Sequence, residues 1–310
     1  MSKFSPSVRL LFWLREAEKV ITASAKATLS PRDLVDIVEN YTNDDVENWV
    51  RELITRGHGS PLEHSLYIFE IVCSRVCSHQ LVRHRHASYS QLSQRYSDKY
   101  LRGLLVKACE HIGCEYREDY RYYIDILDEL AVSQLDFDTL LDIIGEAYIL
   151  PQVIVEKRDK ALLKILLEST RRYYEALVKG VSYEDARYLL PQAVKTRVIM
   201  SMNARELVEV FLPLRMCTRA QWEIRMLAWG IWKQLMEIHP LVFKYTGPRC
   251  VFMENRIREN PCSLVDYLEE RCDFTVERCP EKRPRGEIKQ CIRKACSKIN
   301  LYKNNPKTRV

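Results

Sequence analysis

The chain has 310 residues and a formal net charge of +6, from 48 lysines and arginines against 42 aspartates and glutamates. This mild and mixed excess excludes a histone-like or coat protein and suits an enzyme that handles anionic small molecules. An apolar share of 46% with only 9 glycines and 12 prolines excludes a mainly disordered chain and predicts a packed globular protein.

The sequence begins with an expected strand and two expected helices. Residues 8–12 form a short apolar run that predicts a buried strand, and the alanine-rich residues 15–28 predict a helix. Ser30 followed by Pro31 has the character of a helix cap with proline in the first turn. We therefore expect a second helix to run from there to about Glu39.

Another helix and the strongest strand of the sequence follow. Thr42 or Asn43 predicts the start of a helix that ends at the turn in residues 56–61. Residues 66–73 are rich in β-branched and aromatic side chains and predict a strand. Residues 74–83 predict a short helix, which leads into an unusual polar segment.

The middle of the chain is expected to be helical. Apolar residues recur at three- and four-residue steps over residues 116–150 and 153–179, with a break near Pro151. Ser182 has the spacing of a capping box for the next helix, which must end before Pro191. The acidic and aromatic pattern of the first stretch predicts packing on the outside of the core.

One more strand and a long helical region precede a change in composition. Residues 194–202 contain enough valine, isoleucine and threonine for a strand, and residues 203–237 predict a long helix that is interrupted at Pro213. Beyond Tyr245 charged residues are dense and apolar residues are sparse, which predicts an appendage.

The cysteines predict free thiols and no metal site. The chain has 11 cysteines, and six of them fall between Cys250 and Cys296. No apolar run is long enough for a secretory signal or a membrane span, so we expect a cytoplasmic protein with reduced thiols. The tail has no C-x-x-C pair, and its nearest spacing is Cys291-x4-Cys296, so a four-cysteine zinc site stays an alternative only. Cys73 and Cys77 are expected to be buried as small apolar residues.

The chemistry is concentrated in residues 83–96, which read R-H-R-H-A-S-Y-S-Q-L-S-Q-R-Y. This segment lacks the lysine and glutamate of an ordinary solvent-exposed face. The planar guanidinium group of arginine binds phosphate oxygens in pairs, and serine and glutamine complete phosphate and base recognition. The segment therefore predicts a nucleotide-phosphate site, and the alternative is a solvated basic loop or an ion-pair patch between subunits.

Four sequence blocks, in this order along the chain, resemble the flavin-dependent thymidylate synthase family. The central block is Arg83-His84-Arg85, followed after seven residues by Ser93. The other blocks are R-G-H-G-S-P-L-E-H at residues 56–64, Asn203-Ala204-Arg205, and R-A-Q-W-E at residues 219–223. The resemblance covers about residues 8–245.

The resemblance implies an α+β fold with a central, mostly antiparallel sheet flanked by helices, and active sites at the subunit interfaces of a homotetramer. It implies a catalytic domain at residues 1–245, with a helical insertion at about 98–165, and a cysteine-rich charged extension at residues 246–310. The implied reaction is reductive methylation of deoxyuridylate (dUMP) to thymidylate (dTMP). Its carbon donor is 5,10-methylenetetrahydrofolate, FAD mediates the redox chemistry and NADPH is the reductant, so no enzyme nucleophile is needed.

The family motifs also imply the roles of individual residues. FAD is expected on His58, Ser60, Arg83, His84, Arg85, Gln91, Asn203, Ala204 and Arg205. The nucleotide dUMP is expected on Gln80, Arg83, Gln91, Leu92, Ser93, Gln94, Arg95, Arg187 and Arg215, with Arg187 supplied by a neighbouring subunit. Arg215 is the expected catalytic residue, because a fixed guanidinium at the uracil edge favours ionisation at N3 and polarises the ring.

Two departures from the family pattern concern this site. Gln91 stands where the family often has glutamate, which replaces a carboxylate by a neutral amide beside the nucleotide. The stretch from Asn203 to Arg215 is one residue longer than usual and contains Pro213, which leaves the register of Glu209 open. We expect a local bulge in the helix to absorb the extra residue and to leave Arg215 facing the arginine segment.

Two other functions stay open at this point. A flavoprotein that binds the nucleotide without methylating it is compatible with Gln91 and with the irregular stretch before Arg215. A nucleic-acid-binding protein would use residues 83–95 and 282–298 against phosphates, but the sequence lacks the interleaved aromatic platform and the pervasive basic excess of that class. We therefore expect no nucleic acid and no membrane among the partners.

Overall fold

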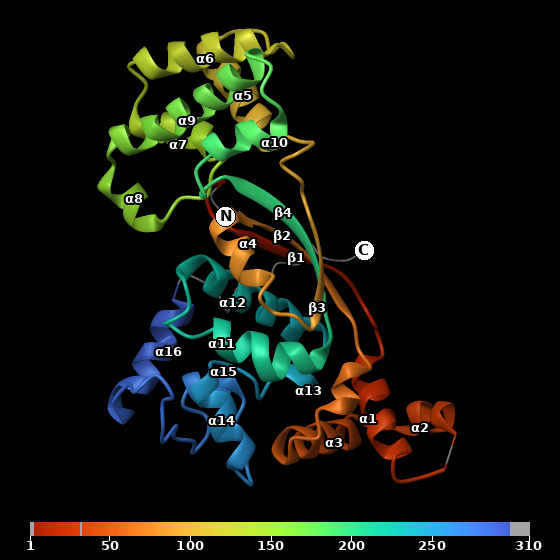
Figure 1. Ribbon diagram of the computed structural model, residues 1–310. Coiled ribbons are helices and arrows are strands. Elements are labelled where there is room, and N and C mark those ends of the chain that lie inside the picture. The colour runs from red at the N-terminus through yellow and green to blue at the C-terminus, as the bar shows by residue number, and fades with distance from the viewer. Residues whose placement is uncertain (1–2, 32, 298–310) are drawn as a thin grey trace. The chain divides into compact units, whose positions relative to one another are not determined.

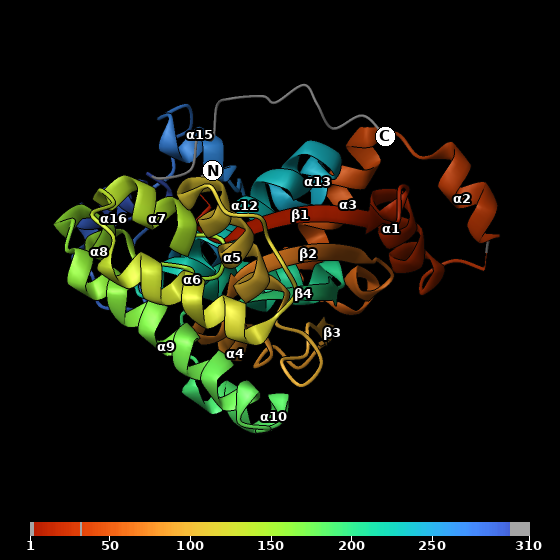
Figure 2. The same ribbon diagram turned by 90° about the horizontal axis from the view of Figure 1, so that it is seen from above.

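The computed structural model describes residues 3–31 and 33–297. Its four-stranded antiparallel sheet has the order β1-β2-β4-β3 (Figures 1 and 2), with the strands β1 (Ser7–Trp13), β2 (Tyr67–Ser74), β4 (Lys195–Met202) and β3 (Ala87–Gln91). The expected α+β class with an antiparallel sheet is confirmed. The three strands that the sequence predicts are also confirmed, each to within one residue at either end. The expectation that the first of them is buried is wrong, because the side chains of β1 are half-buried or exposed.

Strand β3 is absent from the sequence-based expectation. It lies inside the polar segment of residues 83–96, and its side chains are alternately half-buried and exposed. No apolar residue other than Ala87 and Tyr89 marks its pattern, so the alternation signal of a half-buried strand is missing from the sequence. Pairing with β4 at the end of the strand order makes this segment a strand.

Two compact units divide the chain. Unit 1 comprises Met1–Ser7, Ile71–Leu81 and Ser90–Val198, and unit 2 comprises Val8–Glu70, Val82–Tyr89 and Ile199–Val310. Every strand of the sheet passes from one unit into the other. The arginine segment around His84 and the helical region before Arg215 are therefore parts of the same unit, although they are remote in sequence.

Unit 1 consists mainly of helices around an apolar core of its own (Figure 1). They are α4 (Arg75–Leu81), α5 (Lys99–Ile112), α6 (Tyr120–Val132), α7 (Phe137–Ile144), α8 (Gln152–Lys157), α9 (Lys160–Val178), α10 (Tyr183–Ala186) and the 3₁₀ helix η2 (Arg187–Leu189). Helices α6 and α9 pack against each other and bury Tyr123, Leu127, Leu167 and Tyr174. The expected helical middle of the chain is thus confirmed in outline.

The boundaries within unit 1 differ from the expected ones in two places. Helix α5 precedes the stretch in which apolar periodicity predicts helices, although it lies within the helical insertion that the family resemblance implies at about residues 98–165. The stretch of residues 116–150 forms two helices, because the Asp136 carboxylate accepts from the amides of Asp138 and Thr139 and starts α7 anew. Ser182 caps α10 as predicted.

Unit 2 contains the remaining helices. They are α1 (Ala17–Ala27), α2 (Leu34–Asn40), α3 (Asn43–Arg56), the 3₁₀ helix η1 (Ser60–Glu63), α11 (Leu212–Arg215), α12 (Trp222–Ile238) and α13 (Pro240–Phe243). Helix α12 packs on β1, where the Leu10 amide donates to Gln234 Oε1 at 2.6 Å. Gly230 allows this approach, because a Cβ there would lie 2.9 Å from Val8 Cγ1.

The helix starts in unit 2 confirm one predicted cap and correct another. Thr42 caps α3 in a reciprocal capping box with Asp45, as the sequence predicts. The helix expected from Ser30 begins later, because the Asp33 side chain accepts from the Val35 amide and caps α2. None of the helices in the described residues combines the length and the apolar character that crossing a membrane requires.

The described part of the tail, residues 246–297, belongs to unit 2. It forms α14 (Arg249–Ile257), α15 (Leu264–Leu268), the 3₁₀ helix η4 (Arg285–Glu287) and α16 (Ile288–Cys296). Helix α14 contacts α3 and α11, and α16 contacts α12. A disulfide joins Cys262 and Cys272, which corrects the expectation that all cysteines are reduced; the other nine cysteines, all in the described residues, form no disulfide.

Candidate active site

A buried histidine links the arginine segment to the helix that carries Arg215. In unit 2 the imidazole Nδ1 of His84 lies 3.0 Å from Glu206 Oε1, and Arg215 Nε donates to His84 Nε2 at 2.9 Å. His84 is 5% exposed and Glu206 is 4% exposed. Two hydrogen bonds therefore connect a buried carboxylate, through the imidazole, to the guanidinium of Arg215.

The two partners determine the tautomer of His84. An arginine N–H can only donate, so Nε2 of the ring must accept and carries no proton. The ring proton is thereby assigned to Nδ1, which donates to the Glu206 carboxylate. Glu206 thus acts through His84 to hold the guanidinium plane of Arg215.

Aromatic side chains surround the buried His84. The ring of Phe211, which is fully buried, meets the imidazole edge to face with centroids 4.9 Å apart. The Tyr89 hydroxyl donates to the backbone carbonyl of His84 at 3.0 Å. Burial, and then the negative charge of Glu206, raise the pKa of Tyr89, so this hydroxyl stays a donor.

The helix before Arg215 contains the local bulge that the sequence predicts. Glu206–Phe211 form a π-helix, η3, which continues directly into α11, where Pro213 lies in the first turn. A π-turn holds one residue more than an α-turn, so it absorbs an additional residue within the helix. The side chain of Arg215 points to His84 of the arginine segment, as expected.

Arg83 and Arg85 flank the buried histidine and are themselves exposed. No acidic side chain in the part of the chain that the structure describes pairs with either of them. Arg205, in contrast, pairs with the carboxylate of Glu63. Two adjacent unpaired guanidinium groups are therefore available for an anion of a ligand.

Arg205 lies against the turn of residues 57–64. Its Nη1 donates to Glu63 Oε1 at 2.5 Å and its Nε to Glu209 Oε2 at 3.2 Å. The hydrogen bonds to these carboxylates, Glu63 first, raise the pKa of Arg205. Gly59 allows the close approach, since a Cβ there would lie 2.6 Å from Arg205 Nε. Glu209, whose register the sequence left open, faces Arg205.

Asn203 and Ala204 hold the start of this helical region. The Asn203 side-chain oxygen accepts from the Glu206 amide at 2.9 Å and caps the first turn. The amide of Ala204, which is fully buried, donates to Ser65 Oγ at 2.7 Å. Both residues therefore fix the position of Arg205 and Glu206 through their own backbone contacts.

His58 and Ser60 line a pocket of about 540 Å³ in unit 2. Helices α1 and α3 form its walls with, among others, Thr28, Trp49 and Arg56. A volume in this range suits a drug-sized or cofactor-sized molecule. His58 and Ser60 both belong to its lining, and their assignment to the same cofactor stays a prediction.

The other predicted nucleotide residues gather in unit 1. They are Gln80, Gln91, Leu92, Ser93, Gln94, Arg95 and Arg187. The Gln91 amide nitrogen donates to Ser78 Oγ at 3.0 Å and to Thr196 Oγ1 at 3.1 Å, so its carbonyl oxygen is the atom that it offers to a ligand. Arg95 Nη2 lies 3.0 Å from Glu184 Oε2. The Ser78 and Thr196 hydroxyls satisfy the hydrogen-bond donors of the neutral Gln91 amide.

Arg75 is a candidate that sequence reasoning missed. Burial, and then the positive charge of Arg187, lower the pKa of the Arg75 guanidinium. Among the described residues no carboxylate pairs with Arg75, so no acidic side chain offsets the repulsion from Arg187. A bound anion would relieve this repulsion. No motif marks Arg75, because it lies in an ordinary helix start, α4.

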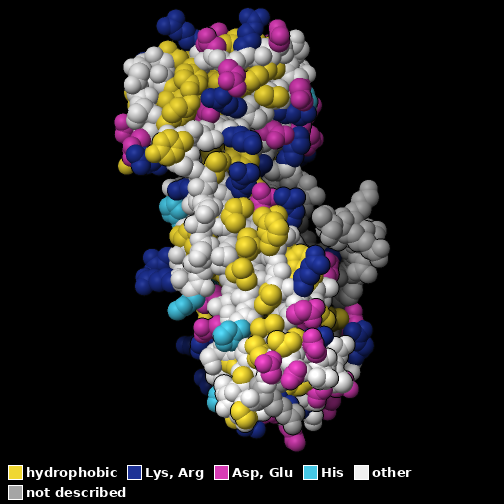
Figure 3. Space-filling model, turned by 90° about the vertical axis from the view of Figure 1, so that its right-hand side faces the viewer, with side chains coloured by type: hydrophobic (Ala, Val, Ile, Leu, Met, Phe, Trp, Pro, Cys, Tyr) yellow, Lys and Arg dark blue, Asp and Glu magenta, His cyan; other side chains and the backbone are white. Residues whose placement is uncertain are grey.

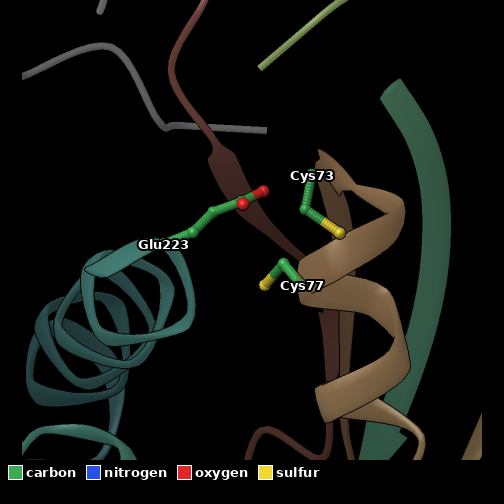
Figure 4. A group of neighbouring side chains, drawn as sticks. All are labelled: Cys73, Cys77 and Glu223. Atoms are coloured by element: carbon green, nitrogen blue, oxygen red, sulfur yellow. The ribbon is translucent and has the colours of Figure 1, made fainter. Parts of the chain in front are cut away.

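Cys73 and Cys77 are buried thiols of unit 1. Cys73 lies near the end of β2 and Cys77 one helical turn later in α4 (Figure 4). Both are fully buried, which confirms the expectation from the sequence. Glu223, drawn with them, is in the first turn of α12 and belongs to unit 2. Two thiols are fewer ligands than a structural zinc ion takes, so they carry no metal site on their own.

These features define a class of protein. An antiparallel α+β fold presents arginines beside a buried His–Glu pair, a cofactor-sized pocket, and a second group of arginines and amides. Such side chains bind phosphates and heterocyclic bases. These features are those of a nucleotide-binding protein of the enzyme type.

Comparisons with known proteins narrow this class. The sequence profile of the family described as "Thymidylate synthase complementing protein" matches residues 9–241. A flavin-dependent thymidylate synthase of Aeropyrum pernix is 43% identical over 305 residues, which cover 94% of this chain and 93% of that protein. One of Sulfolobus acidocaldarius is 36% identical over 294 residues, which cover 94% of this chain and 95% of that protein. The chain belongs to the flavin-dependent thymidylate synthase family.

Solved structures share the fold. Thymidylate synthase X of Helicobacter pylori, determined with FAD and dUMP, superposes with a TM-score of 0.54 at 22% identity and covers 77% of this chain and 97% of its own. The UMP/dUMP methylase PolB of Streptomyces cacaoi, bound with 5-Br dUMP, has a TM-score of 0.54 at 23% identity and covers 77% of this chain and 93% of its own. These similarities confirm the fold.

Proposed function

We propose that the protein catalyses the reductive methylation of dUMP to dTMP for de novo dTMP synthesis. Membership of the family supports the reaction, and the Glu206–His84–Arg215 chain is the observation that carries it. The carbon comes from 5,10-methylenetetrahydrofolate, and NADPH supplies two electrons. The methylene carbon breaks its bonds to the folate nitrogens and, with the two electrons from NADPH delivered as a hydride equivalent, becomes the C5 methyl group. Tetrahydrofolate and NADP⁺ are released, and the hydrogen at C5 of dUMP leaves as a proton. The enzyme is a methyltransferase whose reaction uses no nucleophilic side chain of the protein.

The residues of unit 2 fit FAD. The adjacent exposed Arg83 and Arg85 suit its pyrophosphate, and the pocket at His58 and Ser60 has the volume of a bulky cofactor. When bound, FAD supplies the redox chemistry between NADPH and the one-carbon unit. The other assigned FAD contacts are His84, Gln91, Asn203, Ala204 and Arg205, of which Arg205 must first exchange its carboxylate partners.

Arg215 polarises the uracil ring in this proposal. Its guanidinium is held by His84 and Glu206, so it does not reorganise when negative charge develops on the base. His84 is neutral, since its Nδ1 donates to Glu206 and its Nε2 accepts from Arg215. It therefore orients the guanidinium and leaves the positive charge on Arg215. Because the group is partly buried, its interaction with the developing charge is stronger than it would be in water.

Unit 1 offers a phosphate site for dUMP. Arg187 and Arg75 repel each other in the absence of an anion, and a nucleotide phosphate would compensate both charges. Gln80, Gln91, Leu92, Ser93, Gln94 and Arg95 complete the assigned nucleotide contacts. On the family resemblance alone, we also propose a homotetramer in the cytoplasm, with Arg187 serving a neighbouring subunit.

The reaction is tested by two measurements on the purified protein. We expect an oxidised-flavin absorption spectrum, and we expect tritium release from [5-³H]dUMP that needs both methylenetetrahydrofolate and NADPH. Flavin without tritium release would identify a nucleotide-binding flavoprotein that does not methylate. Nucleic-acid binding without flavin would contradict the proposal altogether. The surface does not favour that outcome, because acidic side chains are interspersed among the basic ones on the face in Figure 3.

The role of Glu206 is tested by Glu206→Gln. The glutamine amide can donate to Nδ1 of His84, which would move the ring proton to Nε2 and set it against the Nε–H of Arg215. We expect turnover to fall by on the order of tenfold, about 1.4 kcal/mol, with little change in the KM for dUMP. NMR of ¹⁵N-labelled histidine should report the changed tautomer. An unchanged turnover together with an unchanged His84 spectrum would contradict the positioning role.

A further inference from the structure

Four cysteines of unit 2 line one pocket that the proposed reaction does not use. Cys217 follows α11, Cys250 lies in α14, Cys279 precedes η4, and Cys291 lies in α16. The pocket has about 350 Å³ of space between its atoms, part of it open to solvent, and its walls are mainly apolar, with Ile288 among them. Four thiols from separate segments of the chain therefore converge on one pocket, while the tail's disulfide is formed by two other cysteines.

Contacts within the pocket resemble those of metal-bound thiolates. The amide of Arg219 approaches Cys217 Sγ at 3.5 Å, and Thr218 Oγ1 lies 3.0 Å from Cys291 Sγ. A bound metal would deprotonate the thiols that it ligates.

The charges around the pocket favour an anionic centre. Arg219 and Arg283 line the pocket, and Glu281 is its one acidic lining residue. Arg225 is near enough for the thiols to act on it: burial lowers its pKa, and negative charge on Cys217 and Cys291 would raise it. Four thiolates around a doubly charged centre leave two negative charges, which these arginines can compensate.

The spacing of the sulfur atoms selects the kind of centre. A tetrahedral zinc ion with Zn–S bonds near 2.3 Å holds its sulfur ligands about 3.8 Å apart. No three of these four sulfur atoms lie within 4.8 Å of one another, a property of the described residues. A cube of four irons and four sulfides separates its thiolate ligands more widely than a single ion does, and four cysteine thiolates are its usual ligands.

We propose that Cys217, Cys250, Cys279 and Cys291 ligate a [4Fe–4S] cluster. The cluster joins the loop after α11 to α14 and α16, and Cys217 lies only two residues after Arg215. Its role is to hold the C-terminal extension on the helix end that carries Arg215. The sequence did not predict it, because no two of its ligands have the short spacing that marks a metal motif, and one ligand precedes the tail.

The cluster is tested by iron and acid-labile sulfide analysis of the full chain, purified without oxygen. We expect about four irons and four sulfides per chain, and a signal in electron paramagnetic resonance after reduction that flavin does not give. Cys279→Ser, in a loop where serine is tolerated sterically, should lose most of the iron. Cys114→Ser removes a comparable half-exposed thiol of unit 1 and should keep all of it.

Two outcomes would overturn the cluster. One is stoichiometric zinc without sulfide, and the other is a protein free of metal that is folded by circular dichroism. Iron retained in full by Cys279→Ser would also contradict the ligand set. These results do not depend on the methylation assay, since iron and sulfide are counted without turnover.

Discussion

Arg215→Ala is expected to lower the turnover of dTMP formation by on the order of a hundredfold or more. The guanidinium is fixed by the hydrogen bond from its Nε to His84, and its charge is the one assigned to the uracil edge. Alanine removes both the charge and the fixed donors, while His84 keeps its bond to Glu206. Single-turnover flavin oxidation and tritium release at saturating dUMP measure the loss.

Two further variants separate charge from geometry at this position. Arg215→Lys keeps the positive charge but lacks the planar fork, so it should recover only part of the lost turnover. Arg121→Ala, an exposed arginine of α6, should leave turnover unchanged. The flavin content of Arg215→Ala must equal that of the wild type, because a loss of cofactor would mimic the effect. Turnover within threefold of the wild type would remove Arg215 from the catalytic role.

The sequence predicted which segments form the site better than it predicted which residues contact them. The arginine segment, the turn and the helical bulge are where the motifs and the extra residue placed them. Glu206 is the partner that was missed, because a glutamate in a helix is ordinary in sequence and gains its role only when the fold buries it against His84. Long-range pairs of this kind leave no trace in residue spacing.

The misses in the fold have similar physical causes. Strand β3 is polar and owes its conformation to pairing with β4, a contact between segments about a hundred residues apart that local propensity does not encode. Helix α7 begins at a cap within a continuous apolar pattern. A prediction from apolar periodicity alone therefore does not separate it from the preceding helix. Strand β2 was predicted well, because its buried residues up to Cys73 alternate with half-buried ones and are apolar.

The arginines differ in whether a carboxylate compensates their charge in the fold. Arg83 and Arg85 are unpaired among the described residues, and Arg75 faces Arg187, whereas many other arginines pair with carboxylates on the surface. Surface pairs of that kind contribute little, and they neutralise one another at a distance. The net excess of +6 therefore understates the local positive field that an anionic ligand meets.

The largest qualitative change is expected when two impaired variants are mixed. Arg187→Ala should raise the KM for dUMP by on the order of tenfold, because the phosphate loses a charge-assisted partner. Arg215→Ala loses turnover. If Arg187 and Arg215 of one active site come from different subunits, some sites of a mixed tetramer contain both intact arginines, and random mixing should restore about a quarter of the wild-type rate.

The measurement compares the mixture with each variant alone, at a dUMP concentration well below the KM of Arg187→Ala. Subunits are dissociated and reassembled together, and native mass spectrometry of differently tagged chains verifies that mixed assemblies form. Each variant reassembled with itself is the control and should stay at its own low rate. Mixed assemblies without any gain in rate would mean that both arginines of a site come from one chain. Arg95 would then bind the phosphate together with Arg187 of the same chain. Arg95 belongs to unit 1, as Arg187 does, and it pairs with Glu184, which is three residues before Arg187.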